Sequence, residues 1–122
     1  MAVLILSVGR DATLLAIRNL ILSGAGYTAV GASTPEEFVE KFYAGDFDVV
    51  VLCHTLPEDQ RRRITQLVHA HSPSTPVVVM ANGDFDQKKP VAGDHALVFG
   101  DTRDLVRVLP DVLRLNQPRR AM

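Results

Sequence analysis

The sequence contains one cysteine and no tryptophan, and its 14 acidic residues nearly cancel its 13 basic ones. With a single cysteine, Cys53, no disulfide can form within the chain, which favours a reducing, cytoplasmic location. A formal net charge of -1 provides no general attraction to nucleic acid or to an anionic membrane. No apolar run approaches the ~20 residues that span a bilayer. The apolar start, Met1–Val8, follows no basic leader and is too short for a signal peptide.

The composition is that of one folded domain. Hydrophobic residues make up 47% and charged residues 22% of the 122 residues, so a core can form without disulfides or metal. The length leaves no room for a second, output domain, and we expect one module over residues 1–116. Residues 117–122, which include Pro118 and two arginines, are expected to form a frayed C-terminal tail.

Five short apolar runs alternate with helical patterns along the chain. The first and third runs are almost wholly Val, Leu and Ile, which is typical of strands covered on both faces in a parallel sheet. The expected strands are Val3–Val8, Tyr27–Ala32, Val49–Cys53, Val77–Met80 and Ala96–Phe99. This alternation predicts an α/β fold, with a doubly wound five-stranded parallel sheet in the flavodoxin-like order 2-1-3-4-5.

The first two helices have recognisable starts. Asp11 or Thr13 is placed to cap the first, whose predicted buried face is Leu14, Ile17, Leu20 and Ile21. In the second, Thr34 is the expected cap, proline follows it, and Glu37 completes a capping box. The apolar residues predicted to be buried in the second helix are Phe38, Val39 and Phe42.

The later helical segments are less regular. A third helix opens near Pro57, and the basic run Arg61–Arg63 within it is interpreted as a solvated face. Its predicted buried residues are Ile64, Leu67 and Val68. Residues 82–94 show no usable period, so the helix between the fourth and fifth strands is expected to be short or irregular. Asp101 or Thr102 can cap the last helix, in which Pro110 should cause a kink or delay the start.

Ligands of such a sheet collect beyond the carboxyl ends of the strands, where the strand order reverses. That point lies here between the first and third strands. The candidate site residues are Ser7, Val8, Gly9, Arg10, Asp11, Cys53, His54, Thr55 and Ala81.

Short motifs border three of the strands. Gly26-Tyr27 precedes the second, Asp46-Phe47-Asp48 leads into the third, Leu56-Pro57 follows the third, and Thr75-Pro76 precedes the fourth. In these motifs, over nearly its whole length, the chain resembles the receiver domain of bacterial response regulators. The resemblance implies a stand-alone module of a two-component (phosphorelay) system, whose partner is a sensor kinase, another regulator or a second copy of the chain.

The resemblance also implies where phosphoryl chemistry would occur. The family uses an acceptor carboxylate, two acids that hold Mg²⁺, a Thr or Ser, and a Lys. These positions fall on Cys53 for the acceptor, on Ser7 and Val8 or Gly9 and Arg10 for the acids, on Ala81 for the hydroxyl, and on Gly100 and Asp101 for the lysine. Without carboxylates there is no oxygen cage for Mg²⁺, and we expect no cofactor. The sequence therefore predicts a pseudo-receiver that signals by protein binding.

Two alternatives stay open. A divergent receiver could accept phosphate at Asp11 or Asp48, although Asp48 precedes the third strand and so lies at the wrong end of the sheet. A small α/β enzyme could use Cys53 as nucleophile and His54 as base. Neighbouring strand residues point to opposite faces, which favours a buried cysteine followed by a loop histidine. His69 and His71, two residues apart on a helix, face different directions, so no metal site is expected.

Overall fold

The sheet of this protein is parallel throughout, in a computed structural model that describes residues 3–53, 55–81, 96–99 and 102–121. Strands β2 (Thr28–Ala32), β1 (Leu4–Val8), β3 (Val49–Leu52) and β4 (Val77–Ala81) lie side by side in that order. Strand β5 (Ala96–Phe99) pairs with β4 at the far edge. The predicted strand order 2-1-3-4-5 is confirmed.

The first and third strands end level with each other. Val8 is the register partner of Leu52, and the backbone N–H of Cys53 donates to the Val8 carbonyl at 2.8 Å. The edge strand β2 is bound from outside as well, because Lys41 Nζ donates to the Gly31 carbonyl at 2.6 Å. The carboxyl ends of β1 and β3 thus form the junction where a functional site is expected.

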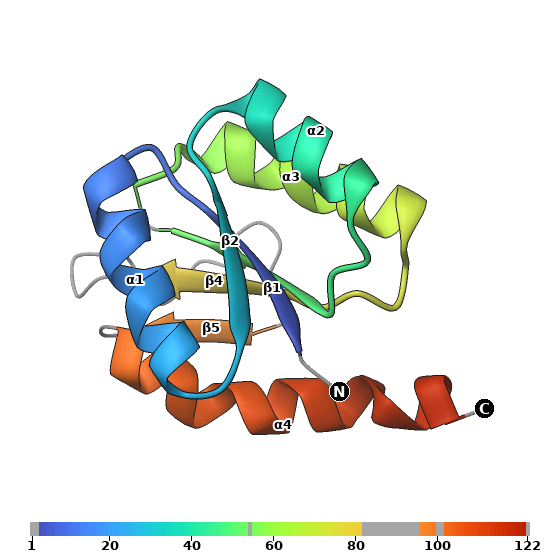
Figure 1. Cartoon of the computed structure of the whole chain (residues 1–122). Coiled ribbons are helices and arrows are strands. Elements are labelled where there is room, and N and C mark those ends of the chain that lie inside the picture. The colour runs from blue at the N-terminus through green and yellow to red at the C-terminus, as the bar shows by residue number, and fades with distance from the viewer. Residues whose placement is uncertain (1–2, 54, 82–95, 100–101, 122) are drawn as a thin grey trace.

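Helices cover both faces of the sheet (Figure 1). Helices α1 (Ala12–Gly24) and α4 (Thr102–Ala121) lie on one face, and α2 (Pro35–Ala44) and α3 (Glu58–His71) lie on the other. The described residues thus include four helices. The helix predicted to be short or irregular, at residues 82–94, lies outside the described part of the chain.

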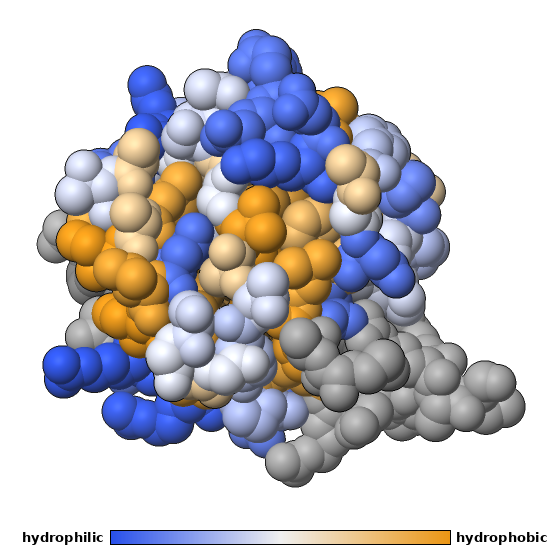
Figure 2. Space-filling model, viewed as in Figure 1, coloured by the Kyte–Doolittle hydropathy of each residue, from blue (hydrophilic) through white to orange (hydrophobic). Residues whose placement is uncertain are grey.

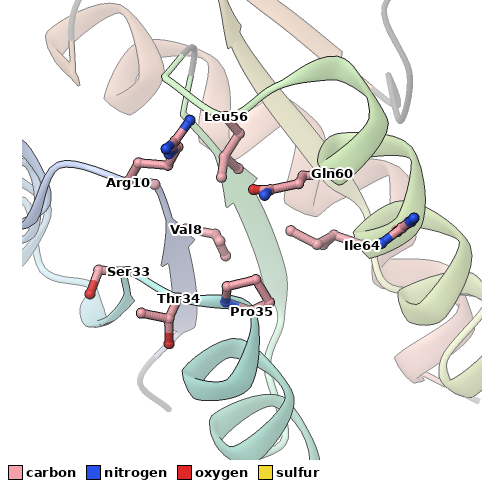
Figure 3. Close-up of a pocket in the computed structure, with 10 residues that line it drawn as sticks. Val8, Arg10, Ser33, Thr34, Pro35, Leu56, Gln60 and Ile64 are labelled. Carbon is pink, nitrogen blue, oxygen red and sulfur yellow. The ribbon is translucent and has the colours of Figure 1, made fainter.

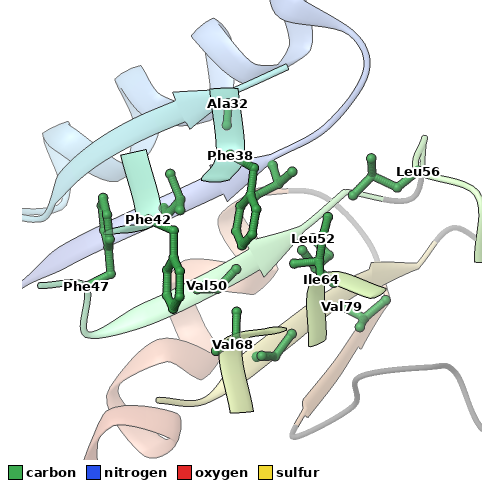
Figure 4. Packing of buried hydrophobic residues seen from close by; sticks show 13 residues of the cluster. Ala32, Phe38, Phe42, Phe47, Val50, Leu52, Leu56, Ile64, Val68 and Val79 are labelled. Carbon is green, nitrogen blue, oxygen red and sulfur yellow. The ribbon is translucent and has the colours of Figure 1, made fainter. Parts of the chain in front are cut away.

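Each face has its own apolar core. Aromatic and branched side chains of α2 and α3 pack on β1, β3 and β4 in one cluster (Figure 4). The members of this cluster are Leu6, Val8, Ala32, Phe38, Phe42, Phe47, Val50, Leu52, Leu56, Ile64, Val68, Val77 and Val79. The opposite cluster is Ile5, Leu22, Val49, Val51, Val78, Met80, Leu105, Leu109 and Val112. The alternation of strand residues between the two clusters follows from the two-residue period of a strand.

Helix α2 begins where its sequence predicts. The backbone N–H of Glu37 donates to the Thr34 hydroxyl at 3.0 Å. The reciprocal bond differs from a capping box, because Glu37 Oε1 accepts from the backbone N–H of Ser33 at 2.6 Å, one residue before the cap. Phe38 and Phe42 are buried as predicted, whereas Val39 is 40% exposed.

The predicted buried face of α1 is wrong. Leu14, Ile17, Leu20 and Ile21 are exposed, Leu20 by 74%. The residues of α1 that are buried instead are Leu15, Arg18 and Leu22. Apolar residues occur all round this helix, so their spacing could not single out one face. Figure 2 shows hydrophobic surface over α1, on the side of the molecule where Figure 1 labels this helix.

Two later expectations also need correction. Arg61, expected in a solvated face, is 4% exposed, and its Nη1 donates to the Leu56 carbonyl at 2.6 Å. Pro110 does not delay α4, which starts at Thr102; the proline is exposed, on the side away from the sheet. The helix spans Thr102–Ala121.

Candidate functional site

The residues proposed as a degenerate pocket separate into different environments. Ser7 is fully buried in β1, and Ala81 is the last residue of β4. Asp11 caps α1, because its Oδ1 accepts from the backbone N–H groups of Thr13 and Leu14 at 3.0 and 3.1 Å. His54 lies outside the described residues. The residues that the structure does bring together are Val8, Gly9, Arg10, Cys53 and Thr55.

Gly9 and Cys53 are in close contact at the ends of the strands. A Cβ placed on Gly9 would lie 2.8 Å from the Cβ of Cys53, closer than real side chains approach. The same Cβ would lie 3.4 Å from the Thr55 hydroxyl. The position next to the acceptor equivalent therefore has no room for a carboxylate side chain unless the backbone shifts.

A short hydrogen-bonded arrangement follows β3. The backbone N–H of Arg10 donates to Thr55 Oγ1 at 3.2 Å, and Thr55 also hydrogen-bonds with Cys53. The first turn of the loop closes when the N–H of Leu56 donates to the Cys53 carbonyl at 3.1 Å. These contacts fix the loop after β3 against the loop after β1.

Arg18 is a site residue that the sequence interpretation missed. It extends from the middle of α1, is 7% exposed, and brings Nη2 to 3.5 Å from Cys53 Sγ. Its Nε and Nη1 have no hydrogen-bond partner among the described residues. The one signal that could have found it is that α1 contains no other charged residue.

The thiol of Cys53 responds to this surrounding. Burial raises its pKa, but the hydrogen bonds with Thr55 and the positive charge of Arg18 outweigh burial, so that the pKa is held below the usual value. Cys53 itself is 1% exposed. The position equivalent to a phosphoacceptor therefore holds a buried sulfur next to a buried cation.

A pocket of about 280 Å³ opens on the other side of Gly9, between α2 and α3. Figure 3 shows Gln60 and Ile64 of α3 pointing across it toward Val8 at the end of β1. The lining residues are Val8, Gly9, Arg10, Ser33, Thr34, Pro35, Leu56, Gln60, Arg63 and Ile64. Two of these are arginines and none is acidic. Sequence reasoning missed the residues from α2 and α3, because their distance along the chain hides their proximity.

The groups that line this pocket differ from the ligands that Mg²⁺ prefers. The ion prefers octahedral oxygen ligands with one or two carboxylates, and the pocket lining contributes arginines instead. Within the described ranges there is no group of three His, Cys, Asp or Glu residues that could hold a metal ion. His69 and His71 lie on α3 and, with Cys53, form no such group there.

Comparisons with known proteins agree on the fold. No protein-family model matches the sequence, and no curated protein sequence matches it. Among solved structures, the chain is similar to a CheY-like response regulator receiver domain from Methanospirillum hungatei, with 22% identity, a TM-score of 0.83, and coverage of 98% of this chain and 99% of that one. It is similar to chemotaxis response regulator CheY4 of Vibrio cholerae, with 18% identity, a TM-score of 0.78, and coverage of 92% and 99%.

A larger protein contains a similar unit. NtrX from Brucella abortus matches with 19% identity and a TM-score of 0.84 over 99% of this chain but 28% of that one. At these identities the likeness shows the fold, an α/β receiver fold with a parallel sheet. Across the described residues, no helix is both long enough and apolar enough to cross a membrane.

Proposed function

We propose that this chain is a receiver-like signalling module of a two-component system that acts by phosphorylation-independent protein binding and is not an enzyme. The observation that carries the proposal is the contact between Gly9 and Cys53. A Cβ on Gly9 would lie 2.8 Å from the Cβ of Cys53, which supports the view that Gly9, one of the positions where the resemblance expects a metal-binding acid, has no room for a side chain. Phosphoryl transfer to a carboxylate relies on metal and cation neutralising charge on the transferred group, and this site lacks the carboxylates for it.

The alternative acceptors have other roles in the fold. Asp11 Oδ1 accepts two backbone hydrogen bonds as the cap of α1. Asp48 Oδ2 accepts from the backbone N–H of Leu4 at 2.8 Å, at the amino end of β3 and the opposite end of the sheet from Cys53. Both carboxylates therefore serve local structure, which favours the binding function over a displaced phosphorylation site.

The test is spectroscopic. The amide NMR spectrum should stay unchanged when Mg²⁺ is added with beryllofluoride or acetyl phosphate, because the strand ends within the described residues offer no cluster of metal ligands and have Cys53 where the resemblance expects an acceptor carboxylate. Intact mass should show no added phosphoryl group. Shifts concentrated at β1 and β3 would overturn the proposal. The variants Asp11→Asn and Asp48→Asn, compared with wild type, would then identify which acid responds.

An exposed apolar face supports protein binding. Two of the six large hydrophobic side chains that are exposed in the described chain, Val39 and Tyr43, lie on α2, on the other face of the sheet. The remaining four lie on α1 and are Leu14, Ile17, Leu20 and Ile21. The charged residue of α1 is turned inward, so this face presents no charge to a partner. Exposed apolar patches on a protein surface often mark sites of protein–protein interaction.

Partner binding can be tested on this face. Leu20→Ser and Ile17→Ser should leave the unfolding midpoint nearly unchanged, because both side chains are exposed. Light scattering after size exclusion measures self-association, and titration with a sensor kinase or another regulator measures heteromeric binding. Ser23→Ala on the same helix is the matched control. Unaltered association of both serine variants in every assay would remove α1 as the binding face.

A further inference from the structure

The contact between Arg18 and Cys53 has a chemical meaning of its own. A guanidinium stays charged in proteins, and a charge removed from water needs a counter-charge or hydrogen-bond acceptors. Arg18 is 93% buried, since its exposure is 7%, and its Nη2 points at Sγ from 3.5 Å. Because Nε and Nη1 have no acceptor among the described residues, the sulfur is the anion-forming group that Arg18 meets.

The other groups around the sulfur act in the same direction. From the loop after β3, Thr55 hydrogen-bonds with the thiol through its side chain and its backbone. From α1, Arg18 is the charged group acting on the thiol, within the part of the chain that is described. From β1, Ser7 and Gly9 are neutral. A negative sulfur is thus met by hydrogen bonds and one positive charge.

We propose that Cys53 is held as a thiolate paired with Arg18 and is a site of oxidation by small hydroperoxides. The thiolate sulfur attacks one peroxide oxygen, an S–O bond forms, and the O–O bond breaks. The departing oxygen leaves with the bonding electron pair and takes up a proton, giving water when the oxidant is hydrogen peroxide. Sulfur is oxidised by two electrons to a sulfenate, and the peroxide is reduced by two.

The surroundings favour the product as well as the reactant. A sulfenate keeps the negative charge and adds an oxygen, which is a stronger hydrogen-bond acceptor than sulfur. Arg18 has two N–H-bearing nitrogens, Nε and Nη1, to offer to that oxygen. The oxidised residue would place an oxygen anion at the position equivalent to a phosphoacceptor, so oxidation would change the charge environment of the strand ends.

Access to the sulfur restricts the oxidant by size. Cys53 is 1% exposed and lies beneath Gly9, which also lines the pocket between α2 and α3. Cys53 is not among the residues that line this pocket, so an oxidant has to pass between packed groups to reach the sulfur. Burial should therefore slow the reaction of Cys53 with a bulky aromatic disulfide reagent more than its reaction with hydrogen peroxide, which is hardly larger than water. Each rate is compared with the rate of the same reagent on a free thiol.

The first experiment measures the thiol directly in wild-type protein. Since Cys53 is the sole cysteine, thiolate absorbance at 240 nm, with Cys53→Ser as the blank, reports one group. We expect an apparent pKa below the ordinary ~8.5 of a free thiol. A pKa at or above that value overturns the proposal, whether or not any variant folds.

The second experiment follows oxidation. Hydrogen peroxide in the presence of dimedone should give one sulfenate adduct by intact mass in the wild type and none in Cys53→Ser. Arg18→Gln should lower the rate at least about tenfold and raise the thiol pKa. Arg61→Gln, which alters another buried arginine, should leave both unchanged. An adduct that forms in urea-unfolded protein but not in folded protein would overturn the proposal.

The proposal does not depend on protein binding. A beryllofluoride-induced spectral change would end the phosphorylation-independent function and leave the thiolate measurement standing. A thiol with an ordinary pKa would overturn the thiolate proposal and leave the phosphorylation-independent function standing.

Discussion

The two faces of the sheet differ in how their helices divide apolar and charged side chains between core and solvent. On the α2–α3 face, aromatic and branched side chains such as Phe38 and Val68 point inward, and Arg61 is the one charged residue of these two helices that is buried. On the α1 face, a helix buries its one charged residue and exposes four large apolar ones. Burial of apolar surface explains the first face. On the second face, α1 buries Arg18 together with Leu15 and Leu22, so the apolar contacts are made alongside a charged group that has lost its water.

Truncation of the α2–α3 core should have the largest effect. Phe38 is 1% exposed and stacks on Phe42 with ring centroids 5.4 Å apart. Phe38→Ala should lower the free energy of unfolding by about 3–5 kcal/mol, measured by urea denaturation. The neighbouring Val39→Ala, at a 40% exposed position, should change it by less than about 1 kcal/mol. Equal losses in the two variants would mean that this face is not packed as described.

The junction between the two faces should be the next most sensitive point. Gly9→Ala forces a Cβ to within 2.8 Å of the Cys53 Cβ and should cost about 1–3 kcal/mol of unfolding free energy. Gly24→Ala is the matched control, because nothing lies within 4 Å of a Cβ at that position at the end of α1. That control should be neutral or stabilising by up to about 1 kcal/mol. A neutral Gly9→Ala would refute the tight contact at the strand ends.

Replacement of the buried Arg18 should raise the stability of the fold, unlike the two substitutions above. Arg18→Met keeps an unbranched side chain and removes the desolvated charge. The Cys53 thiol can take up a proton once its cationic neighbour is gone, so no buried charge is left unpaired and the free energy of unfolding should rise by about 1 kcal/mol. Arg61 is buried too, but its Nη1 donates to the Leu56 carbonyl at 2.6 Å, so Arg61→Met should lower stability by about 1–2 kcal/mol. Thermal or urea unfolding shows whether each variant gains or loses unfolding free energy relative to wild type. If both variants lose stability equally, the two arginines have the same structural role and the contrast fails.

The cap of α2 should give the smallest effect, and one that depends on pH. The hydrogen bond from the Ser33 backbone lowers the pKa of Glu37 below its usual value; burial opposes this, and Lys41 and the Ser33 hydroxyl add to it. A lowered folded-state pKa stabilises the fold above the unfolded value of ~4.3, and this stabilisation is lost as pH falls through the folded pKa. Glu37→Gln should therefore be slightly less stable than wild type at pH 7, and the difference should vanish once the pH is below the folded pKa. A difference that persists in acid would contradict this assignment.

The fold was predictable where local chemistry and burial agree. Thr34 and Pro35 give the start of α2, and the uninterrupted valines of β3 identify a strand covered on both faces. The alternation of such segments then leaves little choice of topology, and the predicted strand order is found.

The prediction of the site was weaker because it depends on side-chain direction. For α1, helical spacing selected Leu14, Ile17, Leu20 and Ile21, although Leu15 and Leu22 are the leucines that pack inward. Arg18 becomes recognisable only when α1 is placed against the end of β3. Arg61 was misassigned for the same reason, since its carbonyl partner is supplied by the loop at Leu56. The residues next to an arginine in the sequence do not show which distant group tertiary packing will place beside its side chain.

The contact between Lys41 and the edge of the sheet has a consequence for solubility. An edge strand with open carbonyl groups is a template for adding further strands, and lysine is a common device against such growth. Here Lys41 Nζ occupies the outward Gly31 carbonyl of β2 at 2.6 Å. This end of the sheet is therefore protected against strand-by-strand aggregation, and a partner that docks beside it has to contact helices rather than extend the sheet.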